Sequence, residues 1–344
     1  MRCVVCGSES TEGGLYCSRC GAIIAERIRL DDPRLVGAED DLRKAIELRR
    51  STDVIIEPLW AIVPLILTIV GMVAGFAVFL AQAPSVNDYQ GWTVADALSS
   101  MRDFFVVMTI FSLASATILA FITYRLVKRR NYHFSSEQGV KMALVKLIKD
   151  AAWSRERYDS VTPELTYMEL GSVQQRRNPL AWSFAIVLSG VPMIGVLPLF
   201  LVSNQDLETR MGLIVLSIGL SVLVGLVASV LMYYMFYWLG KDIREHDTRW
   251  NIFGYNAGNA MSKLGFPSPT TSRYGYSQLP ERSFVLYLVV TLFFSPFVYY
   301  WWYALIKDPN EHLQAHRRFE DDLLASIAGQ RYPSTLVTSM ASTR

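Results

Sequence analysis

The segment Tyr303–Leu313 reads YALIKDPNEHL and is the third copy of a pattern that recurs along the chain. The two earlier copies are YRLVKRRNYHF at Tyr124–Phe134 and YWLGKDIREHD at Tyr237–Asp247. All three fit Tyr-x-Leu-x-Lys-x-x-x-x-His, and each closes a long apolar stretch. An internal repeat of this kind indicates like units that stack with pseudo-symmetry. Its candidate functional residues are Tyr124, Lys128, His133, Tyr237, Lys241, His246, Tyr303, Lys307 and His312.

An apolar stripe continues downstream of each repeated histidine. Apolar residues stand seven, eleven and fifteen positions beyond it, and this four-residue spacing describes one face of a helix. Each copy is therefore expected to be a membrane helix, a polar elbow and an amphipathic helix. In the first copy, Ser135 and Gln138 resemble a capping box that starts the second helix. The stripe residues are Val140, Leu144, Ile148, Phe253, Ala257, Met261, Phe319, Leu323 and Ile327.

The composition places the chain among membrane proteins. Of its 344 residues, 51% are hydrophobic and only 19% are charged, and the apolar residues gather in blocks. Most of these blocks are long enough to cross about 30 Å of hydrocarbon as helices. The net charge of +2 argues against nucleic acid as a partner. The five blocks are Pro58–Gln82, Phe104–Tyr124, Leu180–Val202, Met211–Leu239 and Ser283–Ile306.

The last block allows two topologies. Its length suits one kinked crossing, which would leave the C-terminus outside. Its central Pro296 also suits a re-entrant hairpin that returns the chain to the cytoplasm. The repeat favours the hairpin, because otherwise the third elbow would face the opposite solvent from the other two. We therefore expect a cytoplasmic C-terminus.

Loop charges orient the spans. Segment 82–103 is acidic, whereas YRLVKRR closes the second span and QQRRNPLAW opens the third. By the positive-inside rule, those basic ends face the cytoplasm. This orientation puts the N-terminus in the cytoplasm as well, where thiols stay reduced. The expected localisation is a multi-pass protein of the cell membrane.

All the cysteines lie at the N-terminus, in RCVVCGSESTEGGLYCSRCGAII. Cys3 and Cys6 form one Cys-x-x-Cys-Gly turn, and Cys17 and Cys20 form the other. Two such turns suit a closed, tetrahedral four-thiolate site for one structural Zn²⁺ per chain. A disulfide pair, a rubredoxin-like iron site and a thioredoxin-like redox pair are the alternatives. The last two fit poorly, because the spacer is short and no βαβ pattern surrounds it.

This cysteine segment resembles the short zinc ribbon at the N-terminus of many bacterial and archaeal multi-pass membrane proteins. The resemblance covers residues 1–24. It implies a zinc-binding module that contacts a protein or a nucleic acid in some relatives, and it does not imply an activity. Four protein ligands leave the ion no open position, which argues against zinc catalysis there.

The repeated residues have competing interpretations. The aromatic runs that precede Lys241 and Lys307 are typical of a membrane-interface belt, and lysines at that depth reach lipid phosphates. A ligand-binding aromatic box is the alternative. Each histidine is expected to cap a helix or contact a lipid phosphate. Alternatively, the three could converge and bind a metal, with His316 one turn beyond His312 as a further candidate.

The sequence therefore predicts an all-α polytopic membrane protein with five apolar segments, a threefold repeat and a zinc ribbon. The spans carry no ionisable residue at mid-depth, and the motifs of common enzyme classes are missing, so no catalytic residue is expected. The predicted role is a non-enzymatic scaffold, assembly or regulatory subunit that binds the lipid bilayer and a cytoplasmic or membrane protein. A channel or facilitator, and a membrane enzyme or metal site built on the histidines, are the alternatives.

The expected domains follow from these boundaries. They are the zinc ribbon (1–24), a polar helical linker (25–56), three membrane repeats with their cytoplasmic helices (57–160, 161–270 and 271–329) and a disordered tail (330–344). Segment 161–173, VTPELTYMELGSV, is expected to add a strand or a partner-docking segment.

Overall fold

The computed structural model describes residues 33–82, 94–169, 175–188, 207–266 and 279–331. The predicted zinc ribbon, with Cys3, Cys6, Cys17 and Cys20, and nearly all of the predicted disordered tail lie outside these ranges. Within them, all regular secondary structure is helical. The elements are α1 (Pro33–Thr52), the 3₁₀ helix η1 (Pro58–Ala61), α2 (Val63–Gln82), α3 (Val94–Ser154), α4 (Tyr158–Glu169), α5 (Pro179–Leu188), α8 (Leu207–Lys263), α10 (Phe284–Phe293) and α11 (Phe297–Arg331).

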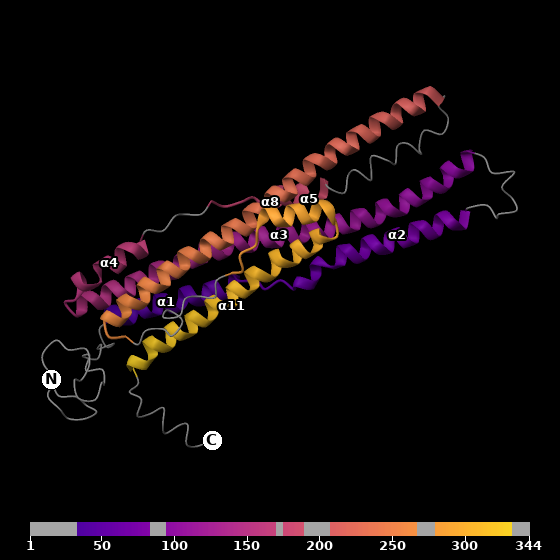
Figure 1. Ribbon diagram of the computed structural model, residues 1–344. Helices are drawn as coiled ribbons and strands as arrows, with labels where there is room; N and C mark the ends of the chain where they lie inside the picture. The colour runs from indigo at the N-terminus through magenta and orange to yellow at the C-terminus, as the bar shows by residue number, and fades with distance from the viewer. Residues whose placement is uncertain (1–32, 83–93, 170–174, 189–206, 267–278, 332–344) are drawn as a thin grey trace, which may run out of the picture.

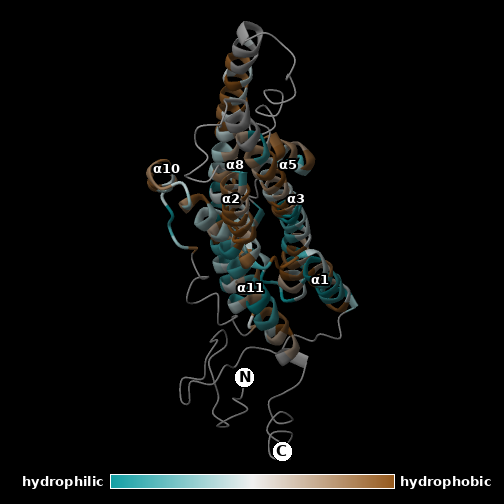
Figure 2. Ribbon diagram, turned by 90° about the vertical axis from the view of Figure 1, so that its right-hand side faces the viewer, coloured by the Kyte–Doolittle hydropathy of each residue, from teal (hydrophilic) through white to brown (hydrophobic). Residues whose placement is uncertain are grey.

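In the described ranges, three stretches of helix are long and apolar enough to cross a membrane. They lie in η1 with α2, in α3 and in α8. Their apolar side chains point outward: Val73 is 63% exposed and Val215 is 67% exposed. Helices that expose apolar side chains over this length need lipid around them. The prediction of an all-α membrane protein is confirmed. Figure 2 shows the apolar ends of α2, α3 and α8 continuing into a more hydrophilic part of the molecule.

The predicted elbows are wrong, because the helices continue straight through the repeated motif. α3 is 61 residues long and α8 is 57 residues long, so each extends over roughly 90 Å, far beyond a membrane. Ser135 lies inside α3 and caps no helix start. Polar pairs one turn apart, Lys241 with Glu245 and Lys307 with Glu311, keep the motif helical. The amphipathic parts therefore form a bundle, which we call the polar bundle, instead of lying in the membrane interface.

The last apolar block forms a helical hairpin. α10 has ten residues and reaches about 15 Å, half of a bilayer core. The chain turns at Ser295 and Pro296, and α11 then runs back alongside α10, with the rings of Tyr287 and Phe297 5.1 Å apart. The kinked single crossing is thus not observed. α11 ends beside α1, in the polar bundle (Figure 1).

The helices enclose two apolar cores. One, the distal core, lies inside the polar bundle and contains all nine predicted stripe residues, each buried. α1 and α4 also pack into it, through residues such as Leu42 and Leu165. The expected strand near 161–173 is therefore wrong over 161–169, where Leu165 and its neighbours form α4. The inward direction of the stripe is confirmed on all three helices.

The second core, the boundary core, lies where the apolar stretches meet the polar bundle. It is rich in aromatic residues from α8 and α11, including Phe236, Trp238, Trp301 and Trp302. These rings are buried against one another; Phe236 and Trp302 lie 4.9 Å apart, edge to face. Only outward residues such as Tyr300 remain available for the predicted interface belt. The other rings pack the helices together.

Candidate metal centre

The three repeated histidines meet between the two cores. His133 on α3, His246 on α8 and His312 on α11 are buried, and so is His316 on the next turn of α11. One ring nitrogen from each of the four lies within 4.8 Å of the others. Each repeated histidine stands between a boundary-core residue and a distal-core residue of its own helix, so the four imidazoles form one polar layer. Their convergence was the less favoured alternative from the sequence.

Carboxylates fix the orientation of two of these rings. His133 Nδ1 lies 2.9 Å from Asp53 Oδ1, and His312 Nδ1 lies 2.9 Å from Asp247 Oδ1. Asp53 follows the end of α1, whereas Asp247 directly follows His246 on α8. An Nδ1–H that donates to a carboxylate leaves Nε2 with its lone pair free to bind a metal. Such carboxylate–histidine pairs are the usual outer shell of histidine metal sites.

The inner nitrogens stand at a metal-ligand spacing. His133 Nε2 lies 3.2 Å from His246 Nε2. A tetrahedral Zn²⁺ with bonds of about 2.0–2.1 Å separates neighbouring nitrogens by about 3.3 Å. The widest pair, at 4.8 Å, would close by about 1.5 Å around such an ion. His312 Nε2 is buried and has no hydrogen-bond partner among the described residues, so one nitrogen of the set is already oriented inward and unpaired.

Glu137 is the acidic neighbour of the cluster. It lies one turn after His133, and its Oε2 is 2.6 Å from His246 Nε2. Without a metal, a proton on His246 Nε2 donated to Glu137 satisfies both groups. With a cation at the centre, the same carboxylate balances its charge or binds it directly. Lys141 pairs with the other oxygen of Glu137 at 2.5 Å and holds the carboxylate in place.

The environment favours the neutral form of His246, His312 and His316, which is the form that binds metals. These residues lie beyond the apolar stretches of their helices. Burial lowers the pKa of His246 to about 3, although Glu137 opposes this shift. Burial also lowers the pKa of His312 and, together with His312 itself, holds the pKa of His316 well below its usual value. Burial raises the pKa of Glu137, but His246 and Lys141 outweigh it, so this carboxyl stays ionised.

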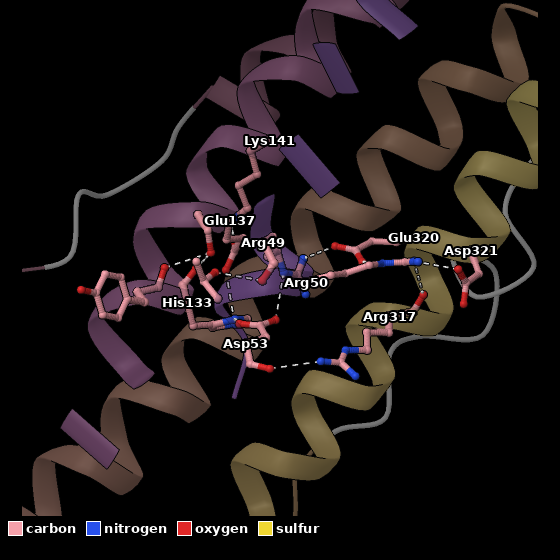
Figure 3. Close-up of polar contacts among 12 residues, drawn as sticks. Arg49, Arg50, Asp53, His133, Glu137, Lys141, Arg317, Glu320 and Asp321 are labelled. Carbon is pink, nitrogen blue, oxygen red and sulfur yellow. Dashed lines mark hydrogen bonds and ion pairs between the residues drawn. The ribbon is translucent and has the colours of Figure 1, made fainter. Parts of the chain in front are cut away.

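A buried ion-pair network ties α1 and α11 to the cluster (Figure 3). Arg49 on α1 reaches Glu320 on α11 at 2.9 Å and Asp53 at 3.4 Å. Arg50 pairs with Glu320 from the other side, also at 2.9 Å. Arg317 donates to the backbone carbonyl of Asp53 at 3.1 Å. The position of Asp53, and with it the orientation of His133, therefore depends on how α1 docks against α11.

A cavity connects the cluster with the surroundings of the polar bundle. It has a volume of about 650 Å³ and opens between α3, α4 and α8. Glu137 and His246 form part of its wall, and lysines such as Lys141 and Lys149 line it as well. Hydrated ions can thus approach the cluster from the side where the Glu137 carboxylate lies.

The repeated tyrosines and lysines do not converge. Lys128 lies over the rings of Tyr124 and Tyr132, and Lys241 lies over Tyr237, each on its own helix. Lys307 pairs with Glu311, and Tyr303 stacks near Tyr300, again along one helix. Among the repeated polar positions in the described ranges, only the histidines come together; the repeated leucines, Leu126, Leu239 and Leu305, meet at the boundary core.

The chain was compared with protein-family models, with curated proteins and with solved structures, and no match was found in any of the three. The geometry of the site therefore carries the functional argument alone.

Proposed function

We propose that this chain is a membrane protein whose polar bundle binds one Zn²⁺ through His133, His246, His312 and His316. The observation that carries the proposal is the pair of Nε2 atoms 3.2 Å apart, one of them on a ring whose Nδ1 is held by Asp53. A cation between these atoms takes both lone pairs; without one, the proton that His246 Nε2 donates to Glu137 leaves only the lone pair of His133 Nε2. Imidazole ligands in a tetrahedral set favour Zn²⁺.

The role we propose for this ion is a clamp and not a catalyst. Four protein nitrogens fill a tetrahedral shell, which is typical of structural sites. The ligands come from three helices that polar contacts such as His312 with Asp247 and His246 with Glu137 already bring together, so the ion locks α3, α8 and α11 in one arrangement. Binding of this kind stabilises the folded bundle, because the site does not exist in the unfolded chain.

The wider function that this arrangement supports is a non-enzymatic scaffold or regulatory subunit. In this proposal the polar bundle faces the cytoplasm, as the basic ends of the spans favour. The N-terminal cysteines, Cys3, Cys6, Cys17 and Cys20, hold a second Zn²⁺ and form the module that contacts a partner protein. Loss of a co-purifying partner in a Cys17→Ser, Cys20→Ser variant is the expected result, and unchanged association contradicts the scaffold role.

The metal content of the purified full-length protein tests the clamp. We expect two zinc ions per chain: one on the cysteines and one on the histidines. His246→Ala is expected to leave one ion, whereas Gln138→Ala, which alters an exposed residue of α3, is expected to leave both. Retention of both ions by His246→Ala, in protein with unchanged helix content, would overturn the histidine site.

Cobalt substitution separates the two sites. Co²⁺ on thiolates gives a sulfur-to-metal charge-transfer absorption that Co²⁺ on imidazoles lacks. In the Cys17→Ser, Cys20→Ser variant this band is expected to vanish, while the weaker ligand-field bands of a four-nitrogen site remain. If no cobalt absorption remains in that variant, the histidines do not hold a metal.

A further inference from the structure

A second pocket lies on the other side of the histidine layer, at the level where the apolar stretches end. Its walls are the parts of α3 and α8 that directly follow their apolar stretches, the start of α10, and α11. The apolar part of its wall comes from the boundary core and its neighbours. These residues include Leu126, Phe236, Phe284, Tyr287, Trp301 and Leu305.

Four arginines also line this pocket, against one carboxylate. They are Arg129, Arg130, Arg244 and Arg282, and the carboxylate is Asp308. Arg282 is neutralised by Asp308, to which it donates two hydrogen bonds of 2.6 and 2.8 Å. Asp242 pairs with Arg130, so two positive charges, those of Arg129 and Arg244, remain beside an apolar surface.

Two of these arginines bond only to neutral oxygens in the described part of the chain. Arg129 donates to the Asn310 side chain at 2.6 Å and to the Ile306 carbonyl at 3.5 Å. Arg244 donates to the backbone carbonyls of Gly240 and Arg282, each at 3.2 Å. Neither guanidinium therefore has its charge compensated by a carboxylate within hydrogen-bond distance.

The third arginine has an unused donor. Arg130 pairs with Asp242 at 2.5 Å, and its side chain is only 9% exposed. Its Nε has no hydrogen-bond partner among the described residues. A buried charged donor without an acceptor is costly, so a ligand that supplies anionic oxygens would be stabilised there. Arginine forks match the oxygens of a phosphate.

We propose that this pocket, whose volume of about 80 Å³ suits a phosphate group, binds the headgroup phosphate of an anionic phospholipid, with the acyl chains outside the pocket, against its apolar rim. Three observations support this ligand class: uncompensated arginines, an apolar wall and a position at the end of the membrane-spanning stretches. Free phosphate shares the headgroup chemistry, but it would leave the aromatic and aliphatic wall unused. The site is separate from the proposed zinc site, although His133 borders both.

Retention of lipid by the full-length protein in detergent tests the proposal. The probe is fluorescent phosphatidylglycerol, compared with phosphatidylcholine carrying the same acyl chains. Wild-type protein is expected to bind phosphatidylglycerol at least about tenfold more tightly, and Arg244→Gln is expected to lose about tenfold. Arg244→Lys keeps the charge and is expected to recover part of this loss.

Arg125→Gln is the matched control. Arg125 lies at the same level of α3, over the ring of Phe121, but does not line the pocket. It is expected to change binding by less than about twofold. Equal losses in Arg125→Gln and Arg244→Gln would indicate diffuse surface attraction and overturn the pocket.

Two further outcomes also decide against the proposal. Equal binding of the two lipids refutes headgroup recognition. Full displacement of phosphatidylglycerol by excess inorganic phosphate shows that the pocket is a phosphate site and refutes the lipid assignment. An unchanged helix content and melting temperature in Arg244→Gln show that the bundle is folded, so a loss of lipid binding cannot be ascribed to unfolding and is independent of the proposed clamp.

Discussion

Replacement of Asp247 by asparagine tests the histidine site without removing a ligand. Asp247 is 4% exposed, and its Oδ1 accepts from His312 Nδ1 at 2.9 Å. Its other oxygen accepts from the backbone of Leu279 at 3.4 Å. Asparagine keeps the size and one acceptor, so the fold is expected to persist. What disappears is the negative charge that holds the Nδ1–H tautomer and makes Nε2 a stronger donor to the metal.

The expected loss in zinc affinity is about 10- to 100-fold, the usual effect of removing an outer-shell carboxylate. This corresponds to about 1.4–2.7 kcal/mol of binding free energy. The value should lie toward the lower end, since the asparagine oxygen can still accept from His312. Competition for zinc between the purified protein and a chromophoric chelator measures this loss, and the Cys17→Ser, Cys20→Ser background keeps the proposed cysteine site out of the titration.

Asp242→Asn is the control for this measurement. Asp242 lies on the same helix, about one turn earlier, and pairs with Arg130 instead of a histidine. Its replacement is expected to change zinc affinity by less than about twofold, because it is not in the outer shell of the site. If Asp247→Asn leaves the affinity unchanged, or if both variants lose it equally, His312 is not a ligand oriented by Asp247.

Two further predictions concern packing and buried charge. Gly71→Ala would place a Cβ 2.6 Å from Phe111 Cβ on α3 and should lower the unfolding free energy by about 1–3 kcal/mol. Gly219→Ala is the control: its Cβ meets no atom within 4 Å, so it should not lower the unfolding free energy. Thermal unfolding in detergent measures both, and equal melting temperatures would contradict the close α2–α3 contact. Arg49→Met leaves the carboxylate of Glu320 buried with less charge compensation and should lower the unfolding free energy by about 3–5 kcal/mol. Adding Glu320→Leu removes the buried carboxylate and should largely restore the stability. Denaturation by urea checks this pair, and an Arg49→Met protein as stable as wild type would show that the network contributes nothing.

Local patterns in the sequence predicted the membrane stretches and the inward stripe. The membrane stretches and the stripe each depend only on the order of residues within one helix. Hydropathy predicts the former directly, and a four-residue period of apolar residues predicts the latter. The nine stripe residues, from Val140 to Ile327, are all buried in the distal core. The continuity of the helices was missed, because Ser135 and Gln138 fit a capping box equally well as a surface pair inside a helix.

The four histidines were named from the sequence, but their convergence was only the less favoured alternative. Convergence depends on how three helices are rotated about their axes and shifted along them, and no local sequence pattern predicts these quantities. The acidic neighbours were missed for the same reason, although two of them left a signal. Asp247 directly follows His246, and Glu137 stands one turn after His133, at the position occupied by Trp250 and His316 in the other copies. A carboxylate beside a repeated histidine could have favoured the metal interpretation.

The hairpin of α10 and α11 explains how the third ligand reaches the site. In each repeat the histidine lies five residues after the lysine, about 7.5 Å along the helix. Helices that leave the apolar region at one level and in one direction therefore bring their histidines to equal height. A single crossing by the last block would have carried His312 to the opposite side of the bilayer, about 30 Å away. The turn at Pro296 reverses the chain, so that α11 leaves the apolar region in the same direction as α3 and α8 and completes the cluster.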